Sequence, residues 1–221
     1  MSKSVFEIKK ESGDWHYDPM VKSTDYKYLG RIVNFNCSEI LKNTKWNKEE
    51  YCTGFKSEDS QKGNNSFENQ INDPIRSQFT KYNTKFQRVF PENAHEIFHK
   101  IKDACKLDIS NFAVLKQDPG HLQPWHFDTY VDRVEKDNLS EDERRKLTRY
   151  LVFLEDWHWG HILQIGNNVI SNWTAGDVIT WEFGMYHLST NAGIFPKYTM
   201  NITGMPNNSS LCQKPNFKIY I

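Results

Sequence analysis

The sequence predicts a mostly β protein with helices toward the N-terminus and a jelly-roll core. From Phe112 onward, eight short apolar segments follow one another, separated by turn-forming residues such as Gly, Asn and Asp. Eight short strands in succession are typical of a jelly roll or a related barrel. Ahead of this region, a stretch that begins at Pro91 has apolar residues at helical spacing.

The first half of the chain, residues 1–110, is rich in Lys, Asn and Ser and contains the clearest helix. In PENAHEIFHKIKDACKL, Pro91 suits the first turn, and the apolar residues that recur at helical spacing are Ala94, Ile97, Phe98, Ile101 and Cys105. We expect this apolar stripe to pack on a sheet. Earlier, residues 31–36 predict a strand, Ser38 is a candidate cap of a short helix, and residues 57–66 predict a polar loop.

The eight predicted strands of the second half are NFAVLK, WHFD, RYLVFLED, HILQIG, NVISNW, GDVITWEF, MYHLST and KYTMNITG. Between two of them, GNN at residues 166–168 predicts a hairpin turn. One charged segment, NLSEDERRKL at residues 138–147, interrupts the series. It places Ser140 three residues before Glu143, which is the pattern of a capping box, so we expect a helix between strands.

A chain of 221 residues fits one domain with a sizeable core. We expect a single domain over residues 1–221: a helical and strand extension over 1–110, the β core over 111–205 and a C-terminal tail over 206–221. Lys plus Arg and Asp plus Glu both number 28, so the formal net charge is zero. Without an overall positive field, nucleic acid is not an expected partner.

The N-terminal segment MSKSVFEIKK has no apolar run after its cations, and the longest strongly apolar run, YLVFL, covers only residues 150–154. Neither suits a secretory signal or a membrane span, so we expect a cytoplasmic protein without a membrane partner. The four cysteines, at positions 37, 52, 105 and 212, lie far apart without a CxxC pair. This spacing favours buried, reduced thiols over a disulfide framework or a zinc site.

The stretch PWHFDTY, residues 124–130, places His126 and Asp128 two residues apart among aromatic rings. Residues i and i+2 of a strand face the same side, so the imidazole and the carboxylate can reach a single point. Together with His187, in the strand-like MYHLST, they would form the two-histidine, one-carboxylate arrangement that leaves positions open on Fe(II).

Other histidines compete with this interpretation. About one His-x-Asp/Glu triplet is expected by chance, and the chain contains a second one, His16-Tyr17-Asp18, before any recognisable sheet. His158 and His161 in DWHWGH form a rival cluster, although its Gly and two Trp residues suit a connection between strands. Packed histidines that bind no metal are the structural alternative for His126 and His187.

Nine residues separate His187 from Lys197, which opens the alternating segment KYTMNIT with Lys197, Thr199 and Asn201 on its polar face. A half-exposed strand would show the same alternation. If the polar face points into the barrel, however, the ammonium group needs a carboxylate, because an unpaired buried charge costs several kcal/mol. A dicarboxylic cosubstrate would supply that carboxylate.

These features together resemble the 2-oxoglutarate and Fe(II)-dependent oxygenases, over residues from about 112 to 204. That superfamily combines a double-stranded β-helix with His-x-Asp, a distal His and a basic residue about ten positions further on. The resemblance implies that His126, Asp128 and His187 are the catalytic iron ligands, and that Lys197 and Thr199 bind the far carboxylate of the cosubstrate 2-oxoglutarate. In its overall sequence pattern the chain is similar to small stand-alone microbial or viral members of this superfamily.

A lysine in place of the usual arginine is similar to the prolyl 4-hydroxylases. In those enzymes the tyrosine of a Tyr-x-x-Gly segment contacts 2-oxoglutarate, whereas this chain has Gln117-Asp118-Pro119-Gly120. The resemblance therefore makes Gln117 a candidate for this contact. Tyr150 on the next strand is a second candidate, and a packed core tyrosine is the alternative interpretation of that residue.

The implied reaction hydroxylates a C–H bond, consumes O2 and decarboxylates 2-oxoglutarate to succinate, with ascorbate as a candidate reductant. Asp128 favours hydroxylation, since halogenating members of the superfamily carry a small residue at that position. Candidate substrate contacts are Trp125, Trp181 and Arg133. The competing interpretation of Trp125 and Trp181 is that they pack in the core. Arg133 belongs to the charged segment 132–147, for which a solvated surface helix is the competing interpretation.

The similarity to prolyl hydroxylases favours an amino-acid-type substrate, whether a protein residue, a peptide or a free amino acid, so the expected partner is a small-molecule, peptide or protein substrate. Two other classes of function stay open. A cupin-like isomerase with Zn or Mn would use the same three ligands without needing Lys197. A non-catalytic jelly-roll binding module would merely pack His126 and His187.

Overall fold

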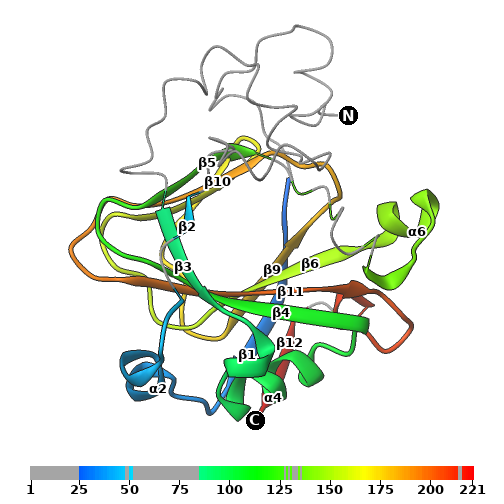
Figure 1. Cartoon of the computed structure of the whole chain (residues 1–221), viewed down its shortest axis with the longest axis horizontal. Coiled ribbons are helices and arrows are strands. Elements are labelled where there is room, and N and C mark those ends of the chain that lie inside the picture. Colours follow the sequence, from blue (N-terminus) through cyan, green and yellow to red (C-terminus); the bar gives the residue numbers. More distant parts are fainter. Residues whose placement is uncertain are drawn as a thin grey trace, which may run out of the picture.

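Two facing β-sheets form the centre of the protein (Figure 1). The computed structural model describes residues 25–47, 50–51, 85–126, 128, 130, 134, 136–213 and 216–221. Across the larger sheet lie, in order, β12 (Phe217–Tyr220), β1 (Lys27–Val33), β9 (Asp177–Trp181), β6 (Thr148–Phe153), β11 (Lys197–Met205), β4 (Asp108–Gln117), β3 (Lys85–Val89) and β2 (Glu50–Tyr51). Across the smaller sheet lie β5 (Leu122–His126), β10 (His187–Asn191), β7 (His161–Ile165) and β8 (Asn168–Ile170).

From β4 to β11 the chain winds between the two sheets. β4, β6, β9 and β11 belong to the larger sheet, whereas β5, β7, β8 and β10 belong to the smaller one. The strand pairs formed among these elements are antiparallel. This arrangement is the double-stranded β-helix form of the jelly roll, so the predicted fold class is confirmed.

The connection between β7 and β8 shows how the local sequence sets the strands. Ile165 pairs with Asn168, which leaves Gly166 and Asn167 as a two-residue hairpin loop. Gly166 has a φ of 55°, a conformation that glycine adopts without a Cβ clash. The predicted turn at GNN is therefore confirmed.

Helices cover the face of the larger sheet that points away from β5 and β10 (Figure 1). On α4 (Glu96–Ala104), Phe98 and Ile101 are fully buried and share one apolar cluster with Val152 and Met200 of the sheet. The short helix α2 (Ser38–Asn43) adds Leu41 to the same cluster. The apolar stripe predicted in this part of the sequence thus packs on a sheet, as expected.

The starts of these helices differ in part from the prediction. Pro91 opens the short 3-10 helix η3 (Pro91–Asn93) and not α4, whose N-cap is His95. α2 has Cys37 at its N-cap without a side-chain cap, so Ser38 is the first helical residue and not the cap. The amide N–H of Ser38 instead donates to the side chain of Asn36, a local turn that replaces the predicted cap.

α6 (Glu141–Lys146) is the predicted helix between strands. Its capping box is present: the Glu143 N–H donates to Ser140 Oγ at 3.3 Å, and the Ser140 N–H donates to the Glu143 carboxylate at 2.8 Å. The guanidinium of Arg144 lies 5.2 Å from the centre of the Phe183 ring, which anchors the helix beside the loop that precedes β10.

Both ends of the described chain depart from the prediction. β1 begins at Lys27 and ends at Val33, whereas the sequence predicts a strand over 31–36. The first half of the strand was missed because Lys27 and Gly30 interrupt its apolar pattern. Within the segment expected to be a tail, β12 adds a parallel edge strand beside β1, and the 3-10 helix η4 (Leu211–Gln213) precedes it. The predicted loop at 57–66 lies outside the described residues.

Three loops bind to one another at the end of the barrel where β11 begins: residues 118–121, 154–160 and 192–196, here called the end loops. The Gly120 N–H donates to the Asn191 carbonyl at 2.8 Å, and the Ala192 N–H donates to the Gly160 carbonyl at 2.8 Å. A Cβ on Gly160 would lie 2.2 Å from the Gly193 nitrogen, so the two backbones meet where no side chain fits.

Among the described residues, Cys37 and Cys105 are buried free thiols and Cys212 is a half-buried one, whereas Cys52 lies outside them. Burial raises the pKa of both Cys37 and Cys105 to about 12. The expected reduced thiols are thus found at these positions. None of the helices in the described part of the chain is long and apolar enough to cross a membrane.

Phe98→Ala should lower the free energy of unfolding by about 3–5 kcal/mol, because it leaves a cavity in the cluster between α4 and the larger sheet. Chemical denaturation followed by circular dichroism measures this change. Lys100→Ala on the exposed side of the same helix is the control and should cost less than about 1 kcal/mol. Equal effects of the two substitutions would contradict the packing described here.

Candidate metal centre

His126 and His187 meet through the pairing of two strands. His126 ends β5, His187 opens β10, and the two residues are direct partners in the antiparallel register. Their ring centres are 4.3 Å apart. Residues paired across antiparallel strands have side chains on the same face of the sheet, so both imidazoles point into the barrel.

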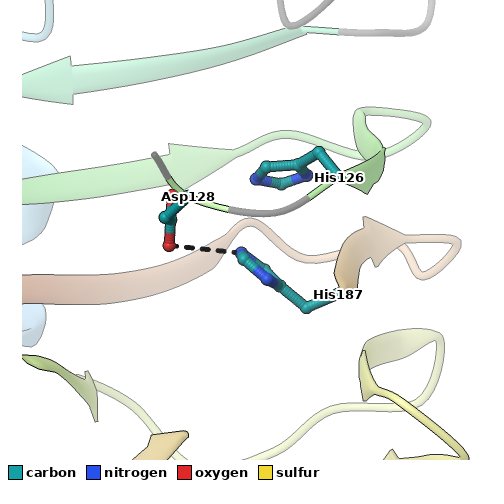
Figure 2. A group of neighbouring side chains, drawn as sticks. All are labelled: His126, Asp128 and His187. Carbon is teal, nitrogen blue, oxygen red and sulfur yellow. Dashed lines mark ion pairs between the residues drawn. The ribbon is translucent and has the colours of Figure 1, made fainter. Parts of the chain in front are cut away.

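Asp128 completes a group of three metal-ligating side chains. Its Oδ2 lies 3.6 Å from His187 Nε2, and Figure 2 shows the carboxylate facing both rings. One potential ligand atom from each of His126, Asp128 and His187 lies within 4.8 Å of the others. Within the described ranges this is the one cluster of His, Cys, Asp or Glu with that spacing, and the structure brings together the predicted triad.

The backbone fixes the tautomer of His187. A carbonyl oxygen only accepts hydrogen bonds, so Nδ1 must be the protonated nitrogen that donates to the Met185 carbonyl at 3.0 Å. Nε2, which faces Asp128, then keeps its lone pair. Burial lowers the pKa of His187, with Asp128 opposing this effect, so the ring is neutral near pH 7. A neutral imidazole held by a carbonyl in this way is ready to bind a metal.

Asp128 is an ionised carboxylate beside a buried arginine. Burial alone would raise its pKa, but Arg149, His187 and His126 outweigh that effect and lower the pKa below its usual value. Arg149 Nη1 lies 2.6 Å from Asp128 Oδ2, an ion pair that keeps the carboxylate charged. A buried, ionised carboxylate beside two imidazoles fits a metal cation.

The donor set is two imidazole nitrogens and one carboxylate oxygen. It fits Fe(II) with positions left open for other ligands, and it also fits Zn or Mn. The geometry therefore supports a metal site at His126, Asp128 and His187 without selecting the metal.

Lys197 lies deep in the barrel, on the same side of the sheet as this centre. It is 2% exposed, and its ammonium group donates to Ser189 Oγ at 2.8 Å and to the Ile162 carbonyl at 2.6 Å. No carboxylate of the described residues forms an ion pair with it, and burial lowers its pKa to about 7. The polar face of β11 therefore points inward, which was the condition set by the sequence.

Gln117 is linked to Lys197 through Ser189. Gln117 is the register partner of Lys197 on β4, and its Oε1 accepts a hydrogen bond from Ser189 Oγ at 2.6 Å. The Gln117 amide donates in turn to the Ser189 carbonyl at 3.1 Å. Gln117 thus orients the hydroxyl that accepts from the ammonium group, whereas its predicted contact with a cosubstrate is a proposal.

Strand β10 connects the metal centre with Lys197. His187, Ser189 and Asn191 are buried on one face of this strand. Two residues along a strand span roughly 7 Å, so His187 at the centre and Ser189 at Lys197 lie about that far apart on the inward face of β10.

Thr199 follows Lys197 on the inward face of β11 by strand alternation and is half-buried. Its hydroxyl makes no side-chain hydrogen bond with the described residues, so the predicted contact with a carboxylate stays a prediction. Further along this face, Asn201 Oδ1 is buried without a hydrogen-bond partner in the described part of the chain.

Tyr150 is excluded from the site, and its prediction as a cosubstrate contact is corrected. The residue is fully buried in the cluster with Phe98 on the helix-covered face of the larger sheet, opposite to Lys197. Its hydroxyl accepts a hydrogen bond from the Cys212 N–H at 3.0 Å. The alternative interpretation as a packed core tyrosine is the one that the structure shows.

Of the three predicted substrate contacts, the structure describes the side chain of Trp181 alone. Trp181 is 7% exposed, and its ring centre lies 4.9 Å from that of His187, so it walls the centre on one side. The side chains of Trp125 and Arg133, and the triplet at 16–18, lie outside the described residues. They remain predictions.

His158 and His161 form no metal centre with an acidic residue in the described ranges. The Nε2 of His161 donates to the Phe195 carbonyl at 2.9 Å, and the ring stacks on Trp173 at 6.3 Å between centres. Burial lowers the pKa of His161, which favours the neutral ring. This histidine helps to hold the end loops together.

Two residues near the centre were missed by the sequence reasoning: Arg149 and Ser189. Ser189 could have been found, since it lies two residues beyond His187 and must share its face. Arg149 opens the apolar run of β6, and alternation places it on the opposite face to Tyr150. Arg149 was missed because the sequence prediction points Tyr150 of this strand into the barrel.

No protein-family model matches the sequence, and no curated protein matches it. Among solved structures, the chain is similar to a predicted oxalate decarboxylase from Thermotoga maritima (13% identity, TM-score 0.35, 55% of this chain and 82% of that one). It is also similar to a prolyl-4-hydroxylase from Pseudomonas putida (14%, 0.38, 55% and 68%) and to a cupin-superfamily sugar phosphate isomerase from Silicibacter pomeroyi (10%, 0.34, 55% and 60%). These TM-scores are below 0.5, so the strand order, and not these similarities, identifies the double-stranded β-helix.

Asp128→Asn and His187→Ala should each lower the affinity for a divalent metal by more than about 100-fold, because a ligand is lost. Calorimetric titration with Co(II), an air-stable probe for this donor set, measures the affinity. His158→Gln is the matched control and should bind Co(II) as the wild type does. An unchanged affinity after the loss of Asp128 would contradict the assigned centre.

Lys197→Met should stabilise the ligand-free protein at pH 7 by a few kcal/mol, because it removes the need to bury an amine that is protonated in the unfolded chain. Between pH 7 and 10.5 the unfolded chain holds a proton at Lys197 that the folded protein lacks. The unfolding free energy of the wild type should therefore rise with pH across this window, and that rise should be smaller in the variant. Denaturation curves at several pH values test this, and parallel profiles would contradict it.

Proposed function

We propose that the protein is a non-haem Fe(II) and 2-oxoglutarate-dependent dioxygenase that hydroxylates a C–H bond. The observation that carries this proposal is Lys197: a buried ammonium group without a carboxylate partner among the described residues, inside the barrel that also holds the metal triad. A metal-dependent isomerase would use the triad but would leave this charge unexplained.

His126, Asp128 and His187 would hold Fe(II), and a set of three protein ligands is the one that leaves a metal open to further ligands. When bound, Fe(II) and 2-oxoglutarate supply an O2-dependent oxidation of a C–H bond, coupled to decarboxylation of 2-oxoglutarate to succinate. The reduced state of the metal is compatible with ascorbate as an external reductant.

Lys197 and Ser189 would bind the far carboxylate of 2-oxoglutarate. The ammonium group already donates to Ser189 Oγ at 2.8 Å, and a carboxylate beside both groups would raise the pKa of Lys197 and keep it charged. Gln117 holds the Ser189 hydroxyl in place through a 2.6 Å hydrogen bond. Thr199, next on the same face, is the second proposed donor to this carboxylate.

The apolar side chains of the barrel interior would keep the reaction dry. Leu151, Phe153 and Ile179 form one buried cluster with Trp181, whose ring lies beside His187. Low polarity around the centre strengthens the attraction between Lys197 and an anion, and it limits side reactions with water. The protein's own part is thus to position two anionic groups and to exclude solvent.

The substrate would be of an amino-acid type: a protein residue, a peptide or a free amino acid. The support for this part of the proposal is the similarity to prolyl 4-hydroxylases at Lys197. Trp181, Trp125 and Arg133 are the proposed contacts to it, of which Trp181 lies beside the centre.

Purified protein with Fe(II), ascorbate and 2-oxoglutarate should release succinate slowly even without a primary substrate. Asp128→Asn should abolish this turnover. Lys197→Ala should raise the concentration of 2-oxoglutarate needed for half-maximal rate by roughly 30- to 100-fold, the loss of a charge-assisted contact of about 2–3 kcal/mol.

Tyr150→Phe is the matched control, because this residue lies on the outer face of the sheet and should leave the requirement for 2-oxoglutarate unchanged. Wild-type affinity for 2-oxoglutarate in Lys197→Ala would refute the role of Lys197. Metal binding without succinate release under any condition would point instead to an isomerase at the same triad.

A further inference from the structure

Arg149 is a second buried cation inside the barrel, at the metal end. It is the register partner of both Trp181 on β9 and Thr203 on β11, and its side chain is 18% exposed. Its guanidinium lies 2.6 Å from Asp128 Oδ2 and 5.2 Å from the centre of the Tyr130 ring. Neither the metal nor 2-oxoglutarate, as proposed above, accounts for a positive charge at this point.

The guanidinium has more donors than the described residues satisfy. Of its five N–H groups, Nε donates to Thr203 Oγ1 at 3.3 Å, and Nη1 faces Asp128 in the ion pair. No acceptor for Nη2 is found in the described part of the chain. A largely buried guanidinium needs acceptors, and its planar fork matches a carboxylate with two parallel bonds.

Positive and negative charges around the centre would also be unequal in number once Fe(II) and 2-oxoglutarate are bound. Without metal, Asp128 neutralises Arg149. With Fe(II) and 2-oxoglutarate, the metal, Arg149 and Lys197 carry four positive charges, whereas Asp128 and the cosubstrate carry three negative ones. In a site of low polarity, one uncompensated positive charge favours the binding of one further anion.

We propose that Arg149 is a substrate-binding residue that pairs with a carboxylate of the primary substrate, so that the enzyme acts on a small organic carboxylate. This inference rests on the proposed function, because a metal bound by Asp128 would draw on the negative charge that now balances Arg149. The substrate carboxylate would then pair with the guanidinium beside Asp128.

The surroundings of Arg149 suit the remainder of such a molecule. The Tyr130 and Phe183 rings lie 6.0 Å apart between centres, and Trp181 lies in register beside Arg149. These aromatic groups offer apolar surface beside Arg149, and the Phe183 ring also lies 5.2 Å from the guanidinium of Arg144, which pairs with Glu141. A carboxylate held by Arg149 lies next to a metal ligand, so the C–H bonds closest to that carboxylate are the ones presented to the centre.

The experiment uses the full chain loaded with Mn(II) and N-oxalylglycine, a non-reacting analogue of 2-oxoglutarate, and acetate as the probe. Mn(II) broadens the NMR signal of a methyl group that binds nearby. Acetate should show saturable broadening, whereas acetamide, of the same size but neutral, should bind at least about tenfold more weakly, since a charge-assisted bidentate pair is lost.

Arg149→Gln should weaken acetate binding at least about tenfold, and Arg149→Lys should retain part of it, because the charge remains but the fork is lost. Arg145→Gln, an exposed arginine on α6, is the matched control and should bind acetate as the wild type does. Mn(II) and N-oxalylglycine binding are measured first for each variant.

Equal binding of acetate and acetamide to the wild type would overturn the proposal, and this comparison requires no variant to fold. Unchanged acetate binding in Arg149→Gln would also overturn it, because acetate would then sit on the metal alone and Arg149 would serve only to hold Asp128. If Mn(II) or N-oxalylglycine fails to bind the wild type, the proposed function fails as well. If both bind and acetate does not, only the role of Arg149 fails.

Discussion

The pairing of β5 with β10 is the constraint on which the candidate site depends. It sets His126 directly opposite His187, and Asp128 follows two residues after the first of them. A slip of one residue in this register would turn one imidazole out of the barrel, because side chains alternate between the two faces of a strand. The same strand β10 carries Ser189 toward Lys197, so one register places both the metal ligands and the polar group at the far end. The backbone pairing of β5 with β10 thus sets where the groups of the candidate site lie relative to one another.

The larger sheet is apolar on the face that the helices cover and partly polar on the face that lines the barrel. Met200 and Ile202 of β11 pack under the helices, whereas Lys197, Thr199 and Asn201 point inward. This is the reverse of a surface strand, in which polar residues face water. The inward polar groups are tolerated where they are paired: Lys197 with Ser189, and Arg149 with Asp128. Both cations face the barrel interior: the ammonium group of Lys197 has three acceptors, whereas the guanidinium of Arg149 has more donors than the described residues satisfy.

The sequence predicts the elements that local patterns determine and misses those that depend on distant partners. The spacing of His126, Asp128 and His187 identifies the triad, since alternation along strands is a local property. Alternation does not tell which of Arg149 and Tyr150 points into the barrel, because β6 is buried on both faces and its apolar run shows no alternation. Likewise, β12 has no local signal of its pairing with β1, since its partner lies at the other end of the described chain. The helix start at Cys37 is missed because a turn at Asn36 replaces the side-chain cap.

The end loops place a constraint on the position of Lys197. A Cβ on Gly160 would lie 2.2 Å from the Gly193 nitrogen, and a Cβ on Gly193 would lie 2.2 Å from the Trp159 carbonyl oxygen, so neither glycine can gain a side chain unless the loops move apart. Lys197 opens β11 directly after the last of these loops. The placement of a cation inside the barrel therefore depends on two residues that have no side chain of their own.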